Sequence, residues 1–480
     1  MKKITAILLA ALLLCLALPV SVAAEGIDIT DKFTDPAFRA ILQTFFEKEI
    51  ILDTDVANIT WISMQSCSIQ SLAGLEYFTA LEWLDCSNNQ LSSLPTLPAC
   101  LENLICNKNQ LTVLPELPSS LIYLHCDDNM LRTLPTLPTG LIQLSCYNNQ
   151  LTELPTLPLG LKELWCSYNQ LTIMPTLPSG LVMLSCYSNM LTELPTLPLA
   201  LDCLRCGSNQ LTALPALPAS LRDLYCAGNR LTALPALPSG LEELNCIDNQ
   251  ITQFPVLSTS LKVLWCGYNS LTALPTLPPN LEKLYCYANQ LTALPALPDS
   301  LKILQCLNNQ LTALPTLPLG LEQLACSHNQ LTNLDVTGLQ LERLDCSWNN
   351  MTSISDVIGF TGTWGATDDD GYIIYRFDPQ KPPPITNATL NDLVAQAKGI
   401  AKGNYTDASW NALQAAIVDA QTIADNENAT QAQLNTQYWV LQNAINRLTS
   451  IRTILSTKYE ATPLNWILFI FLFGWIWMWV

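Results

Sequence analysis

The chain has 480 residues, of which 49% are hydrophobic and only 13% are charged, and its formal net charge at pH 7 is −18. A chain this acidic repels the phosphates of nucleic acids and of anionic membrane surfaces, and it has no basic patch to bind them. Nucleic acids are therefore excluded as partners. The chain is also long for one compact core, although an architecture that grows by repetition escapes that limit.

Residues 1–24 have the three parts of a secretory signal peptide. Lys2 and Lys3 form the charged start, and an apolar stretch follows. Ser21 to Ala24 form a small-residue cleavage site before Glu25. A lipoprotein signal would need a small residue before Cys15, but Leu14 stands there. We therefore predict an exported chain.

Residues 25–58 are predicted to form a helical cap. Asp35 stands directly before Pro36, a combination typical of a helix start. Apolar residues follow at helical spacing: Phe38, Ile41, Leu42, Phe45 and Phe46. A cap of this kind would cover the bare end of a repeat core. An irregular first coil of 22 residues, Ile59 to Ala80, comes next.

From Leu81 to Phe360 the chain consists of fourteen copies of one 20-residue unit, L-x-x-L-x-C-x-x-N-x-L-T-x-L-P-x-L-P-x-x, and only the last copy decays. The register never slips, so cysteines recur every twentieth residue from Cys86 and asparagines from Asn89. Such a period is typical of a leucine-rich-repeat solenoid, in which each coil buries its apolar edge against its neighbours. We predict that this solenoid spans residues 59–355.

The unit also predicts the build of one coil. Positions one, four and six should point inward from a short strand, whereas positions three and five should point to the concave side. The prolines exclude a helix from the second half of the unit. The predicted fold class is therefore an α/β repeat solenoid: a leucine-rich-repeat horseshoe with a parallel concave sheet and an extended, polyproline-like convex side. A small C-terminal three-helix bundle completes the prediction. The repeat asparagine is expected to satisfy buried backbone groups.

The L-P-x-L-P-x-x-L-x-x-L frame with its N-x-L step resembles the short leucine-rich repeats of the bacterial IpaH/YopM type, over roughly residues 59 to 355. Two features depart from that family. The sixth position is Cys, where the family usually carries an aliphatic residue, and no ubiquitin-ligase domain follows the repeats in this sequence. The resemblance therefore implies the fold but no enzyme activity, and we expect no cofactor.

The eighteen cysteines leave three interpretations open. Disulfides are usual in exported proteins, but cysteines in register on parallel strands have side chains that point side by side, a poor geometry for bonding. Zinc sites need closely spaced ligand pairs, and the chain has only two histidines, His125 and His328. We favour a stack of buried thiols that act as small hydrophobes. Cys203 differs, because it occupies a concave third position where exposure is expected.

Positions three, five, seven and eight of the unit vary freely and carry many aromatic side chains. Tyr and Trp dominate binding hot spots, although they also favour strand surfaces for packing reasons alone. We predict that these residues form a concave ligand-binding face for an extracellular protein: Trp83, Tyr123, Tyr147, Trp165, Tyr168, Tyr187, Tyr225, Trp265, Tyr268, Tyr285, Tyr287 and Trp348. The sequence contains no phosphate loop, nucleophile elbow or paired histidine motif, so we predict that the protein is not an enzyme.

Residues 356–381 are predicted to close the C-terminal end with a hairpin that turns at Asp370-Gly371. The acidic triplet that ends at Asp370 suits either a calcium site or a solvated turn. Because it lacks the spaced ligands of an EF-hand, we favour the turn. Residues 382–386 contain three consecutive prolines and form a stiff linker.

Residues 387–449 are predicted to form three amphipathic helices, with a capping box at Thr430 and Gln433. The stretch NYTDASWNALQAAIVDAQTIADNENATQAQLNTQYWVLQNAINRL resembles a FIVAR module, a small three-helix domain of extracellular bacterial proteins. The resemblance implies a spacer or sugar-binding role.

Residues 450–463 are predicted to be a juxtamembrane segment. Residues 464–480 are an uncharged run of 17 residues with four tryptophans, which we predict to be a transmembrane anchor. The alternative is an apolar tail that docks on a partner or lies in the membrane interface.

Together these features predict an exported, membrane-anchored cell-surface protein that mediates extracellular protein recognition or adhesion through its concave aromatic face. Two alternatives remain open at this stage. One is a glycan-binding adhesin, since stacked aromatic rings and a FIVAR-like module both suit sugars. The other is a passive structural component of the cell envelope.

Overall fold

The computed structural model describes residues 26–378, 380, 385–402, 405 and 407–459. They belong to two compact units, Met1–Asp378 and Pro379–Val480, which are treated separately here. The predicted signal peptide, the proline triplet of the linker and the predicted transmembrane anchor lie outside the described residues.

The first unit begins with a small cap made of η1 (Thr30–Lys32), α1 (Pro36–Phe46) and α2 (Asp53–Val56). The carboxylate of Asp35 accepts hydrogen bonds from the N–H groups of Ala37 and Phe38, which starts α1 at the expected residue. The ring of Phe38 stacks on that of Phe78, with 6.4 Å between centroids. Because Phe78 belongs to the first coil, next to η2 (Leu75–Tyr77), the cap covers the end of the solenoid core.

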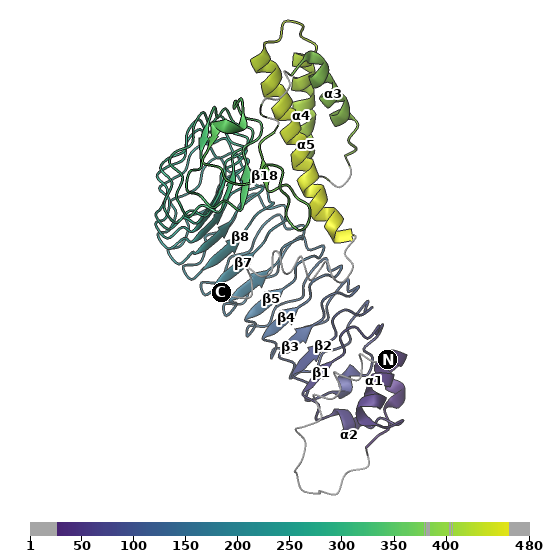
Figure 1. Cartoon of the computed structure of the whole chain (residues 1–480). Coiled ribbons are helices and arrows are strands. Elements are labelled where there is room, and N and C mark those ends of the chain that lie inside the picture. The colour runs from purple at the N-terminus through teal and green to yellow at the C-terminus, as the bar shows by residue number, and fades with distance from the viewer. Residues whose placement is uncertain (1–25, 379, 381–384, 403–404, 406, 460–480) are drawn as a thin grey trace. The chain divides into compact units, whose positions relative to one another are not determined.

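One sixteen-stranded parallel sheet runs the length of the solenoid (Figure 1). Neighbouring strands are in register at a spacing of one 20-residue unit, so that Leu104 lies opposite Leu124. The strands in sheet order are β1 (Trp61–Ser63), β2 (Trp83–Asp85), β3 (Asn103–Ile105), β4 (Tyr123–His125), β5 (Gln143–Ser145), β6 (Glu163–Trp165), β7 (Met183–Ser185), β8 (Cys203–Arg205), β9 (Asp223–Tyr225), β10 (Glu243–Asn245), β11 (Val263–Trp265), β12 (Lys283–Tyr285), β13 (Ile303–Gln305), β14 (Gln323–Ala325), β16 (Arg343–Asp345) and β18 (Tyr375–Arg376).

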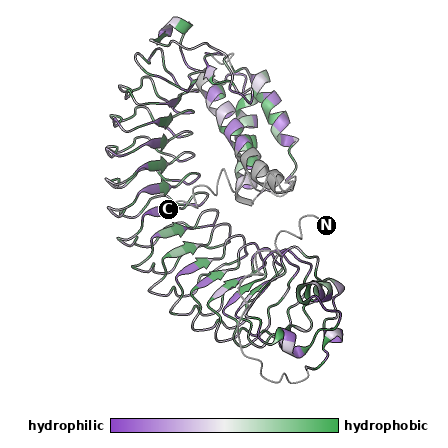
Figure 2. Ribbon diagram, turned by 60° about the horizontal axis from the view of Figure 1, so that its bottom comes forward, coloured by the Kyte–Doolittle hydropathy of each residue, from purple (hydrophilic) through white to green (hydrophobic). Residues whose placement is uncertain are grey.

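The core is a column of identical layers. In the coil that begins at Leu201, the side chains of Leu201, Leu204, Cys206 and Leu211 are all 0% exposed. Each buried leucine contributes roughly 1.5–3 kcal/mol of transfer free energy. The proline-containing half of the regular coils forms neither helix nor strand, and the coils follow an arc with the strands on its inner side (Figure 2). The predicted solenoid with its concave sheet and extended convex side is confirmed.

The repeat asparagines form a second ladder along the solenoid. Asn209 Nδ2 donates to the carbonyl oxygens of Cys186 in the preceding coil and Cys206 in its own coil, at 3.0 and 3.1 Å. Its Oδ1 accepts the N–H of Leu191 at 3.0 Å. The same pattern recurs at Asn109 and at other repeat positions. Each asparagine thus satisfies buried backbone groups of two coils, as predicted.

At the C-terminal end the chain folds back and then adds a strand. The N–H of Ile374 donates to Ala366 at 2.8 Å, and the turn between these arms runs from Asp368 to Gly371. The second arm continues into β18, which joins β16 in parallel. A separate two-stranded parallel sheet, β15 (Leu334–Asp335) with β17 (Val357–Ile358), lies near η3 (Ile354–Asp356) in the sequence. The sequence predicted the reversal but not the added strand.

The second unit contains three helices, α3 (Asn387–Lys398), α4 (Asp407–Ala424) and α5 (Gln431–Tyr459), around a shared apolar core. At the start of α5 the N–H of Thr430 donates to Gln433 Oε1 at 2.9 Å, and the N–H of Gln433 donates to Thr430 Oγ1 at 3.3 Å, which is the predicted capping box. α5 extends ten residues beyond the predicted end of the module at 449. Within the described residues, no helix has the length and apolar character needed to cross a membrane.

Candidate binding face of the solenoid

The twelve predicted aromatic residues divide into two rows. Six lie on the strands at positions three and five: Trp83, Tyr123, Trp165, Tyr225, Trp265 and Tyr285. The other six lie in the turn after the strand: Tyr147, Tyr168, Tyr187, Tyr268, Tyr287 and Trp348. The eighth position of nearly every coil has a positive φ, for example 54° at Tyr168. This left-handed residue turns the chain away from the sheet. The structure thus places half of the predicted residues beside the concave sheet and not on it.

The largest strand cluster lies on β9–β12. The ring of Trp265 stacks on Tyr285 at 5.7 Å and leans toward Tyr225 at 6.3 Å. The guanidinium of Arg205 on β8 lies over the ring of Tyr225, 4.9 Å from its centroid. The hydroxyl of Tyr225 donates to the carboxylate of Glu243. Aromatic rings, a cation and a carboxylate therefore meet on five neighbouring strands.

This cluster contains charges of both signs: Asp223 and Glu243 on β9 and β10, and Arg205 and Lys283 on β8 and β12. Burial raises the pKa of Asp223 to about 6, and the nearby carboxylates of Glu243 and Asp202 add to the shift. Burial and the hydrogen bond to Glu243 likewise raise the pKa of Tyr225, so its phenol stays neutral. Charges of both signs thus lie on a partly dry surface, where each favours an oppositely charged group from a partner.

A second strand cluster lies at the N-terminal end of the sheet. The indoles of Trp61 and Trp83 stack with centroids 4.9 Å apart and an angle of 15° between their planes. Trp61 is 54% exposed, and Tyr123 on β4 is 37% exposed. Trp61 is not among the predicted residues, because the first coil is irregular and has 22 residues. Its signal was the tryptophan that stands 22 residues before Trp83.

Ring pairs also link neighbouring coils along the row of turns. The rings of Tyr168 and Tyr187 are 5.6 Å apart, and those of Tyr268 and Tyr287 are 5.4 Å apart. A Cβ at Gly267 would lie 2.6 Å from the ring of Tyr287, so a larger residue there would displace this ring from its present position. Burial raises the pKa of Tyr168 and Tyr287 to about 12. These tyrosines are neutral and held in place by their neighbours.

The remaining aromatic residues have individual surroundings. Trp348 stacks on His328 with 5.4 Å between centroids. Tyr147 lies beside the buried carboxylate of Asp127, which accepts its N–H at 2.9 Å. Trp165 on β6 forms no ring pair that joins it to the two strand clusters, and its register partners are Ser145 and Ser185. The structure therefore brings the predicted residues together as several small clusters.

The repeat cysteines lie inside the solenoid. All fourteen from Cys86 to Cys346 are buried, and the 17 described cysteines are free thiols. The thiol of Cys126 donates to the carbonyl oxygen of Ser145 in the next coil at 3.4 Å. Burial raises the pKa of Cys186 and Cys286 to about 12, which keeps both thiols protonated.

The expectation that Cys203 is exposed was wrong. Its side chain is only 4% exposed, although position three faces the concave side. Parallel strands lie about 4.8 Å apart, so longer neighbouring side chains cover a small residue between them. The side chain of Arg205 interacts with Cys203 directly, and burial still raises the thiol pKa to about 11.

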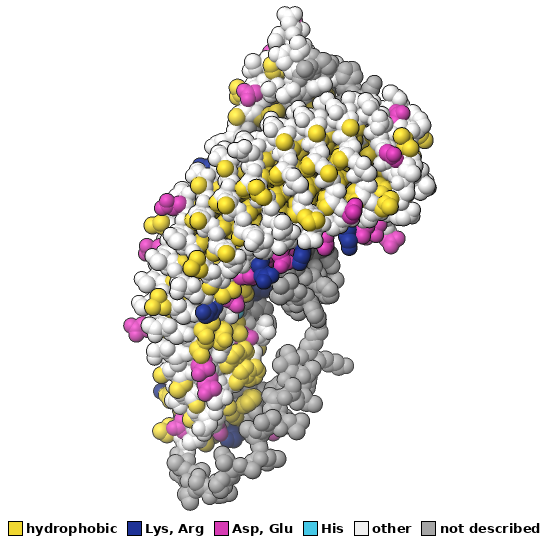
Figure 3. All heavy atoms as spheres, turned by 90° about the vertical axis from the view of Figure 1, so that its left-hand side faces the viewer, with side chains coloured by type: hydrophobic (Ala, Val, Ile, Leu, Met, Phe, Trp, Pro, Cys, Tyr) yellow, Lys and Arg dark blue, Asp and Glu magenta, His cyan; other side chains and the backbone are white. Residues whose placement is uncertain are grey.

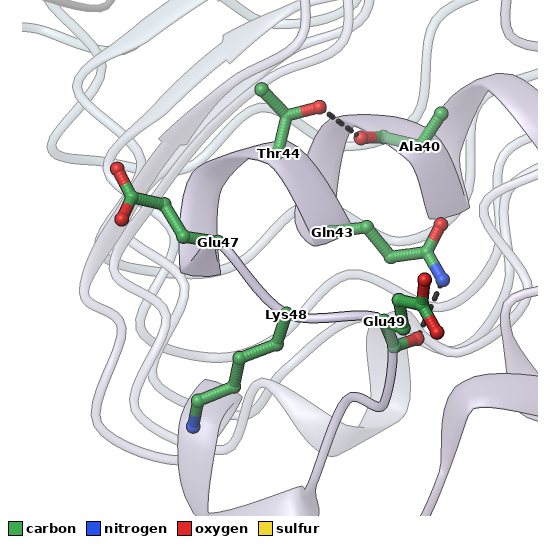
Figure 4. A pocket seen from close by; sticks show the side chains of 6 residues that line it. All are labelled: Ala40, Gln43, Thr44, Glu47, Lys48 and Glu49. Carbon is green, nitrogen blue, oxygen red and sulfur yellow. Dashed lines mark hydrogen bonds between the residues drawn. The ribbon is translucent and has the colours of Figure 1, made fainter.

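A shallow depression lies beside α1 in the cap, lined by Ala40, Gln43, Thr44, Glu47, Lys48 and Glu49 (Figure 4). Gln43 Nε2 donates to the carbonyl oxygen of Glu49 at 2.6 Å, and Thr44 Oγ1 donates to Ala40 at 2.7 Å. Lys48 pairs with Asp55 at 2.5 Å. These polar groups bind one another, and none converges on a common point. Across the described parts of both units, no three metal-ligating side chains gather to hold an ion.

Comparison with known proteins identifies this architecture. A family model described as Leucine Rich Repeat matches residues 80–104. The structure of the leucine-rich effector protein YopM from Yersinia pestis is 35% identical, with a TM-score of 0.56, and the match covers 61% of this chain and 84% of YopM. The chain belongs to the leucine-rich-repeat family. YopM from Yersinia enterocolitica is also 35% identical, with a TM-score of 0.51, and 60% of this chain and 73% of that one are covered.

A third similar structure is described as containing a ladder of cysteines. The functional domain of InlJ from Listeria monocytogenes, whose structure is described as including a cysteine ladder, is 27% identical with a TM-score of 0.62. The match covers 70% of this chain and 78% of the InlJ domain.

Two curated relatives match short segments only. Lacto-N-biosidase from Bifidobacterium longum is 43% identical over 68 residues, which are 14% of this chain and 4% of that protein. The polysaccharide lyase 8 family protein HylA from Enterococcus faecalis is 32% identical over 71 residues, which are 15% of this chain and 5% of that protein. A leucine-rich-repeat solenoid is typically a binding scaffold without catalytic activity, and these fragments are too short to carry an enzyme.

The outer surface of the leucine-rich-repeat unit differs from its sheet face. Figure 3 shows rows of apolar side chains across one side of the solenoid, with charged side chains gathered along its margin. At the second position of successive coils, Arg222 pairs with Glu242 at 2.9 Å, and Lys262 pairs with Glu242 at 2.6 Å. Charges of opposite sign are therefore paired with one another along this part of the row.

Proposed function

We propose that this leucine-rich-repeat protein is exported, anchored at the cell surface, and recognises another protein through the aromatic side chains of its concave sheet. The observation that carries the proposal is the cluster of Tyr225, Trp265 and Tyr285 on β9–β12, with the cation of Arg205 and the carboxylate of Glu243 beside it. Rigid amphipathic rings next to desolvated charges are the usual composition of a protein-binding hot spot.

The shape of the sheet face also suits a protein partner. Each strand contributes only two outward side chains, so a ligand must extend over many coils to gain affinity. The curved sheet offers such a continuous surface, and the depression beside α1 contains no convergent set of polar groups. Large flat surfaces of this kind bind macromolecules, whereas small ligands need an enclosed pocket.

The proposal that the chain is exported and anchored rests on its sequence. Residues 1–24 have the composition of a signal peptide, and residues 464–480 that of an apolar anchor. Removal of residues 1–24 would take away Lys2 and Lys3 and no acidic residue, so the net charge would change from −18 to −20, which would bias encounters toward basic partners. A cell-surface receptor or adhesin fits these features together.

The test compares binding of the full chain and of two triple variants to intact cells and to extracts of their surface proteins. The first variant changes Tyr225, Trp265 and Tyr285 to Ala. The matched control changes Leu159, Leu199 and Leu319 to Ala, because these apolar side chains are 77–86% exposed and lie outside the strands. We expect saturable binding that is lost on protease treatment of the target and in the first variant only. Equal binding by both variants would refute a role for the cluster.

A glycan ligand is the second candidate. The names of the two curated relatives describe enzymes of carbohydrates, and residues 387–449 resemble a FIVAR module. Exposed aromatic rings also suit the apolar faces of sugars. If the ligand is a glycan, binding in the same assay should persist after protease treatment of the target and should be lost after periodate oxidation of the target.

A further inference from the structure

The first strand of the solenoid has an open edge. β1 pairs only with β2, with Trp61 opposite Trp83 and Ser63 opposite Asp85. The N–H of Met64 donates to the carbonyl oxygen of Asp85 at 2.7 Å. With this parallel register, the N–H and C=O groups of Trp61 and Ser63 point away from β2. Within residues 26–378, no strand pairs with β1 on that side.

The same chain shows how such an edge is completed. At the opposite end of the sheet, the short strand β18 adds to β16 in parallel. The N–H of Leu344 donates to Ile374 at 2.8 Å, and the N–H of Cys346 donates to Arg376 at 3.0 Å. A short extended segment with no repeat sequence of its own therefore suffices as a further strand of this sheet.

The side chain of Trp61 provides specificity at the edge. One face of its indole stacks on Trp83, so the other face is turned toward the open side, in keeping with its 54% exposure. Elsewhere in the sheet, Arg205 on β8 lies over the ring of Tyr225, which holds the same position on the next strand. An arginine on a strand added beside β1 would have the same relation to Trp61.

The surroundings of the edge favour a basic occupant. Residues 26–85 contain ten Asp or Glu and three Lys or Arg, a local net charge of −7. Residues 56–75 around β1 carry no charge and no proline, so the side chains that usually protect an edge strand are missing. The cap lies beyond β1 in the stack of coils and hinders end-to-end approach of a second solenoid (Figure 1). A single strand needs only about 4.8 Å beside β1.

We propose that the open edge of β1 binds an extended, arginine-containing segment of a protein partner, which adds as a parallel strand and stacks an arginine on Trp61. This inference rests on the proposed function as a protein-recognition module, and it names a second contact region and the chemistry of the segment that fills it.

The experiment uses the full chain and a labelled heptapeptide of alternating threonine and arginine, blocked at both ends, with binding followed by fluorescence anisotropy. Ser63→Pro removes one outward N–H and leaves the hydrogen bonds between β1 and β2 in place. Ser63→Ala is the matched control that keeps the N–H. We expect saturable binding that Ser63→Pro and Trp61→Ala each weaken at least tenfold and Ser63→Ala leaves unchanged. Circular dichroism confirms that each variant is folded.

Three results would overturn the proposal: no saturable binding of the arginine peptide, equal binding by Ser63→Pro and Ser63→Ala, or equal binding of a peptide with glutamate in place of arginine. A dimer of the full chain that Ser63→Pro dissociates would assign the edge to a second copy instead. The Tyr225, Trp265 and Tyr285 triple variant should still bind the peptide. Peptide binding without cluster-dependent cell binding would therefore reject the proposed function alone, and the reverse result would reject this inference alone.

Discussion

Asp127 is a buried carboxylate whose protonation should make the stability of the solenoid depend on pH. It is 4% exposed and accepts the hydroxyl of Ser145 at 2.5 Å and the N–H of Tyr147 at 2.9 Å. Burial, with a further contribution from the neighbouring Asp128, raises the pKa of Asp127 to about 7 from an ordinary value near 3.8. The two hydrogen bonds oppose the shift but do not cancel it.

The direction of the effect follows from the two pKa values. Between about pH 4 and pH 7, the folded chain holds a proton on Asp127 that the unfolded chain has released. This contribution to stability is fully present below pH 3.8 and is lost as the pH rises through about 7. A shift of about three pKa units corresponds to roughly 4 kcal/mol at most between the two limits, at 1.36 kcal/mol per unit.

The equivalent position in another coil shows how a residue without a carboxylate fits at the site of Asp127. Two coils later, Ser167 takes the place of the aspartate, shares a hydrogen bond of 2.8 Å with Ser185, and accepts the N–H of Tyr187 at 3.1 Å. Asp127→Ser should therefore fit the same geometry without a carboxylate. We expect this variant to be more stable than the original chain by about 2–4 kcal/mol at pH 8.5 and nearly equal to it at pH 4.

The assay is urea unfolding followed by circular dichroism at pH values from 4 to 9. Ser167→Asp is the reciprocal variant, and it should acquire a loss of stability above neutral pH. Parallel stability curves for the original chain and Asp127→Ser across this range would show that Asp127 ionises freely in the folded state. That result would refute the reasoning from burial.

Three further predictions concern the frame of the fold. Asn209→Ala should cost about 1–3 kcal/mol in urea unfolding, because the N–H of Leu191 loses its side-chain acceptor and the carbonyl oxygen of Cys186 loses one of its two amide donors. An unchanged midpoint would contradict a structural role for the ladder. Asp35→Ala should cost about 1–2 kcal/mol at pH 7, whereas Asp31→Ala should have little effect. Burial raises the pKa of Asp35, but hydrogen bonds from four backbone N–H groups outweigh that effect and lower it. The stabilisation that the Asp35 carboxylate gives the fold should therefore be lost as the pH falls below about 3.8. Iodoacetamide should alkylate the exposed Cys100 in the native chain long before the repeat cysteines, as peptide mass spectrometry would show; labelling at equal rates, or repeat cysteines already oxidised, would contradict the buried-thiol interpretation.

The structure of the repeating coils was predictable because each repeat residue, such as the leucine at position four, has the same surroundings in every coil. A leucine at position four must face the core in all coils or in none, since a slip of one residue would turn the strand over. The burial of Leu104 and Leu124 opposite each other therefore follows from the sequence alone. The asparagine ladder was equally predictable, because a buried amide at a constant distance from the strand must bond backbone groups of its own coil and of a neighbouring coil, here the preceding one.

The surface was less predictable because it depends on contacts between residues that share no pattern. Nothing in the sequence indicates that Tyr225 and Trp265 lean together across β10, or that Arg205 covers Cys203. The burial of Asp127 depends on a serine 18 residues later. The parallel pairing of β18 with β16 was not predicted either, because the two residues of β18 carry too little pattern to indicate which strand they join.

The buried repeat residues and the outward strand residues are largely separate sets, and this affects how the ligand specificity of the protein can change by mutation. Along each strand the buried side chain, such as Leu224, is flanked by two outward side chains, here Asp223 and Tyr225, that take no part in the core. Changes at outward positions are therefore largely free of a stability cost, and coils that are not in contact contribute almost independently. The limit appears where a surface residue becomes buried, as at Cys203 on β8 and at Asp127 in the turn after β4. At such sites recognition and stability are coupled, so a change of ligand at these coils would require compensation in the adjacent strand.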